Sequence, residues 1–121
     1  MSDLAIEEMK PFIPATDYAK SLEFYVALGF EVASDMGELA YLKFEATSFL
    51  LQDYSQPDFA KHYMMHLQVE DVDAWHAHVV SAGVVERFGV KLGEPQEQPW
   101  RMRDFTLTDP SGVLWRIAQR I

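Results

Sequence analysis

The sequence predicts an α+β fold, in which two βαβββ repeats form a curved mixed sheet with helices on its convex side. Two candidate helices begin after Asp17 and Asp71 and end before Gly29 and Gly83, and both pairs of residues are 54 positions apart. Such a fixed period indicates a duplicated architecture. A tight turn at 109–112, between two alternating segments, adds a terminal β-hairpin. We therefore expect a single domain over residues 1–121, with repeats at about 5–54 and about 62–121 and a linker at 55–61.

Composition limits the possible compartments and partners. The chain has 121 residues, 49% of them hydrophobic, which suits one buried core. It has no apolar run long enough for a membrane helix, no secretory signal and no cysteine, so we expect a cytoplasmic protein without disulfides or a membrane partner. The net charge of −9 argues against nucleic acid as a partner. It also favours cationic ligands, although acidic surfaces commonly serve solubility alone.

The first repeat is predicted from alternation and capping signals. A first strand at Glu7–Ala15 contains two prolines, which place it at an edge or an interface because proline donates no ladder hydrogen bond. The helix Tyr18–Leu28 has apolar residues at helical spacing between its aspartate cap and its terminal glycine. Three further strands are expected at Phe30–Ser34, Leu39–Phe44 and Ser48–Tyr54.

The second repeat follows the linker Ser55–Lys61 in the same order. A strand at His62–Val69 leads into the helix that begins after Asp71 and ends at Gly83. The short apolar segment Val84–Phe88 is predicted as a strand, and Gly89–Pro99 as a long loop. The terminal hairpin is formed by strands at Arg101–Thr108 and Val113–Gln119.

Three segments resemble the vicinal-oxygen-chelate superfamily, and together they span nearly the whole chain. They are ATDYAKSLEFYVALGF, VEDVDAWHAHVVSAGV and DPSGVLWRI. The superfamily includes glyoxalase I, extradiol dioxygenases, fosfomycin-resistance enzymes and bleomycin-resistance proteins, and the ending QPWRMRDFTLTDPSGVLWRIAQ is most similar to the bleomycin-resistance group. The resemblance implies a homodimer with ligand clefts at or near the subunit boundary, and some relatives exchange strands between subunits.

Enzymes of this superfamily bind a divalent metal through residues of the first and last strands of each repeat. The matching positions in this chain are Lys10, Gln52, Met64 and Arg116. Ammonium and guanidinium groups have no lone pair to donate, and a thioether suits Cu(I) rather than the metals of these enzymes. We therefore expect no metal and no cofactor, and we assign the four side chains to ligand binding instead.

Aromatic side chains are predicted to line the cleft. Phe12 shares a strand face with Lys10, Tyr41 lies on a middle strand, and Trp100 stands beside a loop. Aromatic walls suit planar ligands and cations. The alternative is that aromatic residues in alternating strands simply form the core, which we expect for Phe24, Tyr25, Trp75 and Trp115.

Three polar residues complete the candidate set. His66 shares a strand face with Met64, so it could hydrogen-bond to a ligand or serve as an ordinary polar wall. Asp104 could add negative charge to the cleft, or it could pair with Arg116 across the terminal hairpin.

These features favour a metal-independent protein that sequesters a small molecule, resembling the bleomycin-resistance proteins. Its ligand would be partly aromatic, with a cationic group as one option. A metal-dependent lyase or isomerase of the glyoxalase type is the alternative, and an interaction module without a cavity is a third possibility. No catalytic residue is assigned. The predicted ligand-binding residues are Lys10, Phe12, Tyr41, Gln52, Met64, His66, Trp100, Asp104 and Arg116.

Overall fold

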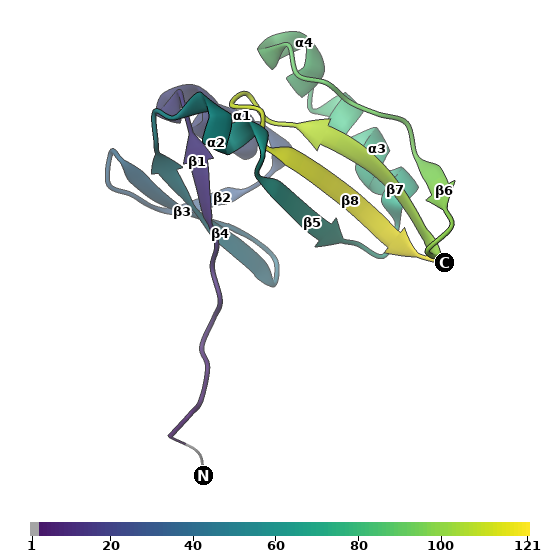
Figure 1. The fold of residues 1–121 in the computed structure, drawn as a ribbon, viewed down its shortest axis with the longest axis horizontal. Coiled ribbons are helices and arrows are strands. Elements are labelled where there is room, and N and C mark those ends of the chain that lie inside the picture. The colour runs from purple at the N-terminus through teal and green to yellow at the C-terminus, as the bar shows by residue number, and fades with distance from the viewer. Residues whose placement is uncertain (1–2) are drawn as a thin grey trace.

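A computed structural model describes residues 3–121 and arranges most of them in two βαβββ modules (Figure 1). Each module contains a four-stranded mixed sheet, ordered β1-β4-β3-β2 in the first and β5-β8-β7-β6 in the second. In each sheet the first and last strands of the module are parallel, and the other neighbours are antiparallel. The predicted α+β class and its two repeats are confirmed.

The first module consists of β1 (Phe12–Ala15), α1 (Tyr18–Leu28), β2 (Glu31–Asp35), β3 (Leu39–Phe44) and β4 (Thr47–Asp53). After α2 (Pro57–Lys61), the second consists of β5 (Met64–Gln68), α3 (Val72–Ser81), α4 (Val84–Phe88), β6 (Gln96–Gln98), β7 (Met102–Thr108) and β8 (Leu114–Arg120).

Helix α1 has the bounds that the sequence predicts, because both of its ends are fixed locally. The Asp17 carboxylate accepts a hydrogen bond from the backbone amide of Lys20 at 3.1 Å, which caps the N-terminus. Gly29 ends the helix with a φ of 110°, a left-handed conformation that glycine adopts without strain.

Four predicted elements need correction. The segment Val84–Phe88 forms helix α4 instead of a strand, and its buried residues lie four positions apart, on one helical face. The predicted linker contains α2, and the predicted loop contains β6. The first strand begins at Phe12 rather than at Glu7.

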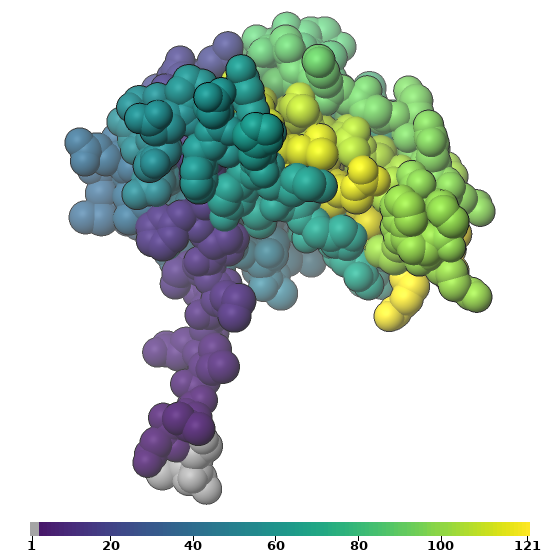
Figure 2. All heavy atoms as spheres, viewed as in Figure 1, coloured from purple at the N-terminus to yellow at the C-terminus, as the bar shows by residue number. Residues whose placement is uncertain are grey.

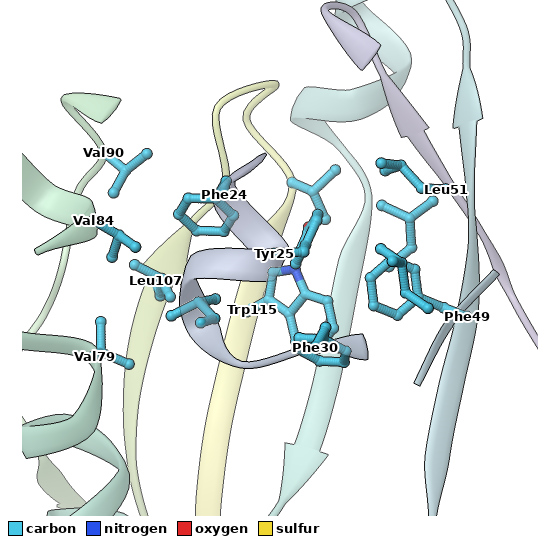
Figure 3. Packing of buried hydrophobic residues seen from close by; sticks show 14 of the residues in the cluster. Phe24, Tyr25, Phe30, Phe49, Leu51, Val79, Val84, Val90, Leu107 and Trp115 are labelled. Carbon is cyan, nitrogen blue, oxygen red and sulfur yellow. The ribbon is translucent and has the colours of Figure 1, made fainter. Parts of the chain in front are cut away.

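The two modules share one aromatic cluster (Figure 3). The indole of Trp115 in β8 lies 5.7 Å from the ring of Tyr25 in α1, and the rings of Phe30 and Phe49 lie 6.1 and 5.7 Å away. Phe24, Tyr25 and Trp115 are buried as predicted, whereas Trp75 is half-buried at the edge of this core. Packing across the modules therefore fixes how the two sheets are placed relative to each other.

The turn between β7 and β8 makes buried hydrogen bonds between the modules, and this network of Asp109, Ser111, Tyr25, Trp115 and Thr16 is here called the polar joint. Asp109 accepts hydrogen bonds from the Tyr25 hydroxyl at 2.6 Å and from two backbone amides of its own turn at 2.9 Å. Trp115 Nε1 donates to the same hydroxyl at 2.8 Å, and the Ser111 hydroxyl accepts from the Thr16 amide at 2.9 Å. Burial raises the pKa of Asp109, while the hydrogen bonds that it accepts oppose this rise.

Residues 3–11, here called the arm, extend away from the body of the molecule (Figures 1 and 2). Three apolar side chains of the arm are exposed, Leu4 by 84%, Ile6 by 83% and Met9 by 87%. Near its end, Glu8 accepts hydrogen bonds from Tyr41 and Ser48, and these bonds lower the pKa of Glu8. No helix among residues 3–121 has the length and hydropathy needed to cross a membrane.

Candidate functional site

The candidate site is built on the sheet faces that point away from the shared core, here called the outer faces. Successive side chains of a strand point to opposite faces, so outer-face residues alternate with core residues such as Leu51 and Ile117. Strand register places these residues in rows that cross each sheet. The predicted ligand-binding residues therefore divide between two separate sheets.

On the first sheet the central row is mostly apolar. Leu50 of β4 pairs with Phe12 of β1 on one side and with Tyr41 of β3 on the other. Phe12 is 49% exposed although it is a large apolar side chain. Gln52, two residues further along β4, pairs with Pro14 and Leu39.

On the second sheet the equivalent row is polar. Arg116 of β8 pairs with His66 of β5 and with Thr106 of β7. Met64 lies two residues before His66 on the same face and is 59% exposed. A guanidinium, an imidazole and a hydroxyl thus lie side by side on an open sheet.

A buried carboxylate orients Arg116. Asp104 in β7 is 2% exposed and accepts from Arg116 Nη1 at 2.9 Å and from Gln98 Nε2 at 3.0 Å. Of the two alternatives for Asp104, the structure thus shows the pairing across the terminal hairpin. The other N–H groups of Arg116 have no hydrogen-bond partner among residues 3–121, so they are available to a ligand.

Trp100 stands at one end of this sheet, in the turn between β6 and β7, and is 59% exposed. It lies at the end of the sheet where Met102 pairs with Arg120, four residues along β8 from Arg116. A large exposed indole is suited to stacking on a planar ligand.

Lys10 lies in the arm, outside any strand. Its ammonium is 3.4 Å from Glu8 Oε1 and 4.9 Å from the centroid of the Tyr41 ring. Tyr41 itself donates to Glu8, so the arm already engages these two predicted ligand-binding residues.

The strand register also corrects one correspondence between the repeats. Phe12 and His66 are 54 residues apart, the spacing of the two helix caps, and their partners are Leu50 and Arg116. Leu50, rather than Gln52, therefore occupies the position equivalent to Arg116. The sequence did not indicate Leu50 and Thr106 as members of the rows, because strand register, which sequence spacing leaves open, places them there.

Comparisons with known proteins agree with this architecture. A sequence model of the Glyoxalase/Bleomycin resistance protein/Dioxygenase superfamily matches residues 9–117. The chain belongs to this superfamily. A bleomycin resistance protein of Klebsiella pneumoniae is 22% identical over 118 residues, covering 93% of this chain and 92% of that protein.

Solved structures of the superfamily superpose over nearly the whole chain. A bleomycin-binding protein complexed with bleomycin has a TM-score of 0.82 and 22% identity, with 96% of this chain and 100% of that chain covered. The antibiotic binding protein TnmS3 from Streptomyces sp. CB03234 has a TM-score of 0.75 and 26% identity, with 98% and 99% covered. These likenesses concern the superfamily fold and do not by themselves identify a ligand.

At the positions of the superfamily's metal site, residues 3–121 present no complete donor set. Among residues 3–121, no group of three or more His, Asp or Glu side chains is placed to hold a metal ion. The row on the second sheet presents an arginine where a carboxylate or imidazole would be needed, and the corresponding row on the first sheet presents Phe12 and Leu50. These donors do not fit a divalent metal.

Proposed function

We propose that this protein binds and sequesters a small, partly aromatic compound on the outer face of its second sheet, without making or breaking bonds. One observation carries the proposal. Arg116 pairs with His66 in register and is held by the buried carboxylate of Asp104, while its side chain stays 29% exposed and its other N–H groups have no partner among residues 3–121. A preoriented donor group costs little entropy on binding, so it suits recognition of a carbonyl, carboxylate or phosphate group.

Trp100 supplies the aromatic contact in this proposal. Stacking of a ligand ring on its exposed indole contributes about 0.5–1.5 kcal/mol beyond area burial. The net charge of −9 attracts the cationic part of the ligand, because the row of His66, Arg116 and Thr106 holds no carboxylate of its own. Bleomycin, the ligand named for a solved relative, is the first compound to test.

We also propose that the working unit is a homodimer. The two rows lie on separate sheets, and the exposed Phe12 and Met64 leave apolar surface at the outer faces. The arm presents three exposed apolar side chains away from the body of the molecule. A second copy of the chain is the partner that would cover these surfaces and place a first-sheet row opposite a second-sheet row.

Calorimetric titration of the purified protein with metal-free bleomycin tests the proposed binding. We expect one binding event per subunit, weakened by Trp100→Ala and by Arg116→Gln, with Arg87→Gln as a matched control on the exposed surface of α4. Absence of binding at high micromolar bleomycin would reject bleomycin as the ligand, and a titration unchanged by both variants would reject this face as its site. Sedimentation equilibrium of the same sample tests the dimer, which a monomer at all concentrations would refute.

Elemental analysis separates sequestration from metal-dependent catalysis. After incubation with Ni²⁺, Mn²⁺, Fe²⁺ and Zn²⁺, we expect no stoichiometric metal because the donor set does not fit one. One tightly held ion per subunit would instead favour the lyase or isomerase.

A further inference from the structure

A groove of about 580 Å³ lies between the two modules, away from most of the outer-face residues. One side is formed by residues 44–47, at the turn between β3 and β4, and the other by residues 66–71 with Ala74 and Trp75. The turn lies beside the edge of β5 that pairs with no strand, and Figure 2 shows the blue turn behind the teal residues of β5. His66 and Gln68 belong both to the groove lining and to the outer face of the second sheet. The groove and that face are therefore adjacent, but their other lining residues differ.

Two aromatic rings form the apolar wall of the groove. The rings of Phe44 and Trp75 lie 5.1 Å apart at an angle of 48°, and both side chains are half-buried. Behind them, the His78 ring packs edge-on against Trp75 at 5.4 Å, and its Nε2 lies 2.6 Å from the Leu28 carbonyl oxygen. The indole is therefore fixed from behind, with part of its surface open to the groove.

Three carboxylates, those of Glu45, Glu70 and Asp71, also line the groove, and none of its lining residues is a lysine or an arginine. Asp71 uses one oxygen to cap α3, through the Ala74 amide at 3.0 Å. Glu45 and Glu70 make no hydrogen bond or ion pair with any residue in 3–121. Glu45 also has a φ of 50°, an uncommon conformation for a residue other than glycine and one found often at functional positions.

We infer that this groove binds a planar aromatic cation, with its ring against Trp75 and Phe44 and its positive charge near Glu45 and Glu70. An indole face attracts a cation through its quadrupole, and the two carboxylates add direct attraction. An anion would meet three carboxylates and no compensating cation in the lining. The inference rests on the proposed function for the class of ligand, but it uses different side chains and does not require the dimer.

Thioflavin T, a planar aromatic cation whose fluorescence rises on binding, is the probe for this site. We expect the double variant Glu45→Gln/Glu70→Gln to bind it roughly tenfold more weakly than the parent protein, because two attractive charges are lost. The matched control is Glu31→Gln/Glu86→Gln, which removes the same charge from exposed positions outside the groove and should bind as the parent does. Trp75→Phe should weaken binding, whereas Phe59→Leu, at an exposed ring outside the groove lining, should not.

Three results would overturn the inference. They are unchanged affinity in Glu45→Gln/Glu70→Gln, an equal loss in the control, or a loss in Phe59→Leu that matches the loss in Trp75→Phe. The bleomycin titration distinguishes failure of the groove inference from failure of the proposed function. If bleomycin binds in a way that depends on Arg116 while thioflavin T does not bind, the groove inference fails and the proposed function stands. If thioflavin T binds through Glu45 and Glu70 while bleomycin does not bind, the groove inference stands without support for sequestration on the outer face.

Discussion

Replacing Tyr25 by phenylalanine tests the polar joint between the modules. The hydroxyl is fully buried, donates to Asp109 at 2.6 Å and accepts from Trp115 Nε1 at 2.8 Å. Its removal loses a hydrogen bond to a carboxylate, worth about 1.5–3 kcal/mol, and leaves a buried indole N–H unpaired, which costs about 1–3 kcal/mol. Since the two losses share one site they do not add fully, and we expect the free energy of unfolding to fall by about 2–4 kcal/mol.

Urea unfolding followed by fluorescence measures this loss. Parent and variant are compared at one protein concentration, because a dimer's stability depends on concentration. Tyr54→Phe is the matched control, since this tyrosine is exposed and its hydroxyl has no hydrogen bond within residues 3–121, so a change within about 0.5 kcal/mol is expected. A loss in Tyr25→Phe no larger than the control's would refute the argument that the joint stabilises the fold.

The pH dependence gives a second readout of the same variant. Burial raises the pKa of Asp109 and the bond from Tyr25 lowers it, so the variant has a higher folded-state pKa than the parent. A carboxyl group with a raised folded-state pKa loses its stability contribution as pH rises through that value. The stability deficit of Tyr25→Phe should therefore be larger at about pH 7 than at about pH 4, and a deficit independent of pH would count against this account.

Three further predictions concern other contacts. Gly112→Ala should destabilise the terminal hairpin by about 1 kcal/mol or more, seen as a lower urea midpoint, because Gly112 has a φ of 99° and a new Cβ would lie 3.3 Å from the last side chain of α2. Lowering the pH should release the arm from Tyr41, because the pKa of Glu8 lies below its ordinary value of 4.5 and its contribution is lost as pH falls through the folded value. The Tyr41 ring resonances in NMR should shift over that range, and a flat titration would contradict the contact. Asp104→Asn should weaken bleomycin binding in calorimetry, because the amide holds the neighbouring guanidinium less firmly, and an unchanged dissociation constant would argue against that orienting role.

Local signals made most of the fold predictable from the sequence. The caps of α1 and α3 lie within a few residues of the segments that they end, so Asp17 and Asp71 could be recognised from sequence alone. Helix α4 could not, because a five-residue apolar segment with two valines has no period long enough to distinguish a helix from a strand. Its helical form depends on burying Val84 and Phe88 together, which is a tertiary effect.

The sequence indicated which residue types form the candidate site, but not how their side chains are placed in space. Alternation indicated that His66 shares a face with Met64, but the direct pairing of His66 with Arg116 depends on parallel register, which sequence spacing leaves open. The groove at Trp75 was not predicted, because its two sides come from different modules. Tyr25 was expected in the core, yet its bond to Asp109 joins residues 84 positions apart, and no local pattern encodes such a contact.

The shared aromatic cluster determines how the chain can be divided. Each half, cut within residues 55–61, would contain a complete βαβββ repeat. Yet the first half would expose the sides of Tyr25, Phe30 and Phe49 that Trp115 covers, and the second half would expose Trp115, since this indole packs against all three rings. We therefore expect the separate halves to aggregate or remain unfolded, and to regain structure as complementing fragments when they are mixed. A single repeat is thus an architectural unit, but only the two repeats together form a unit that folds.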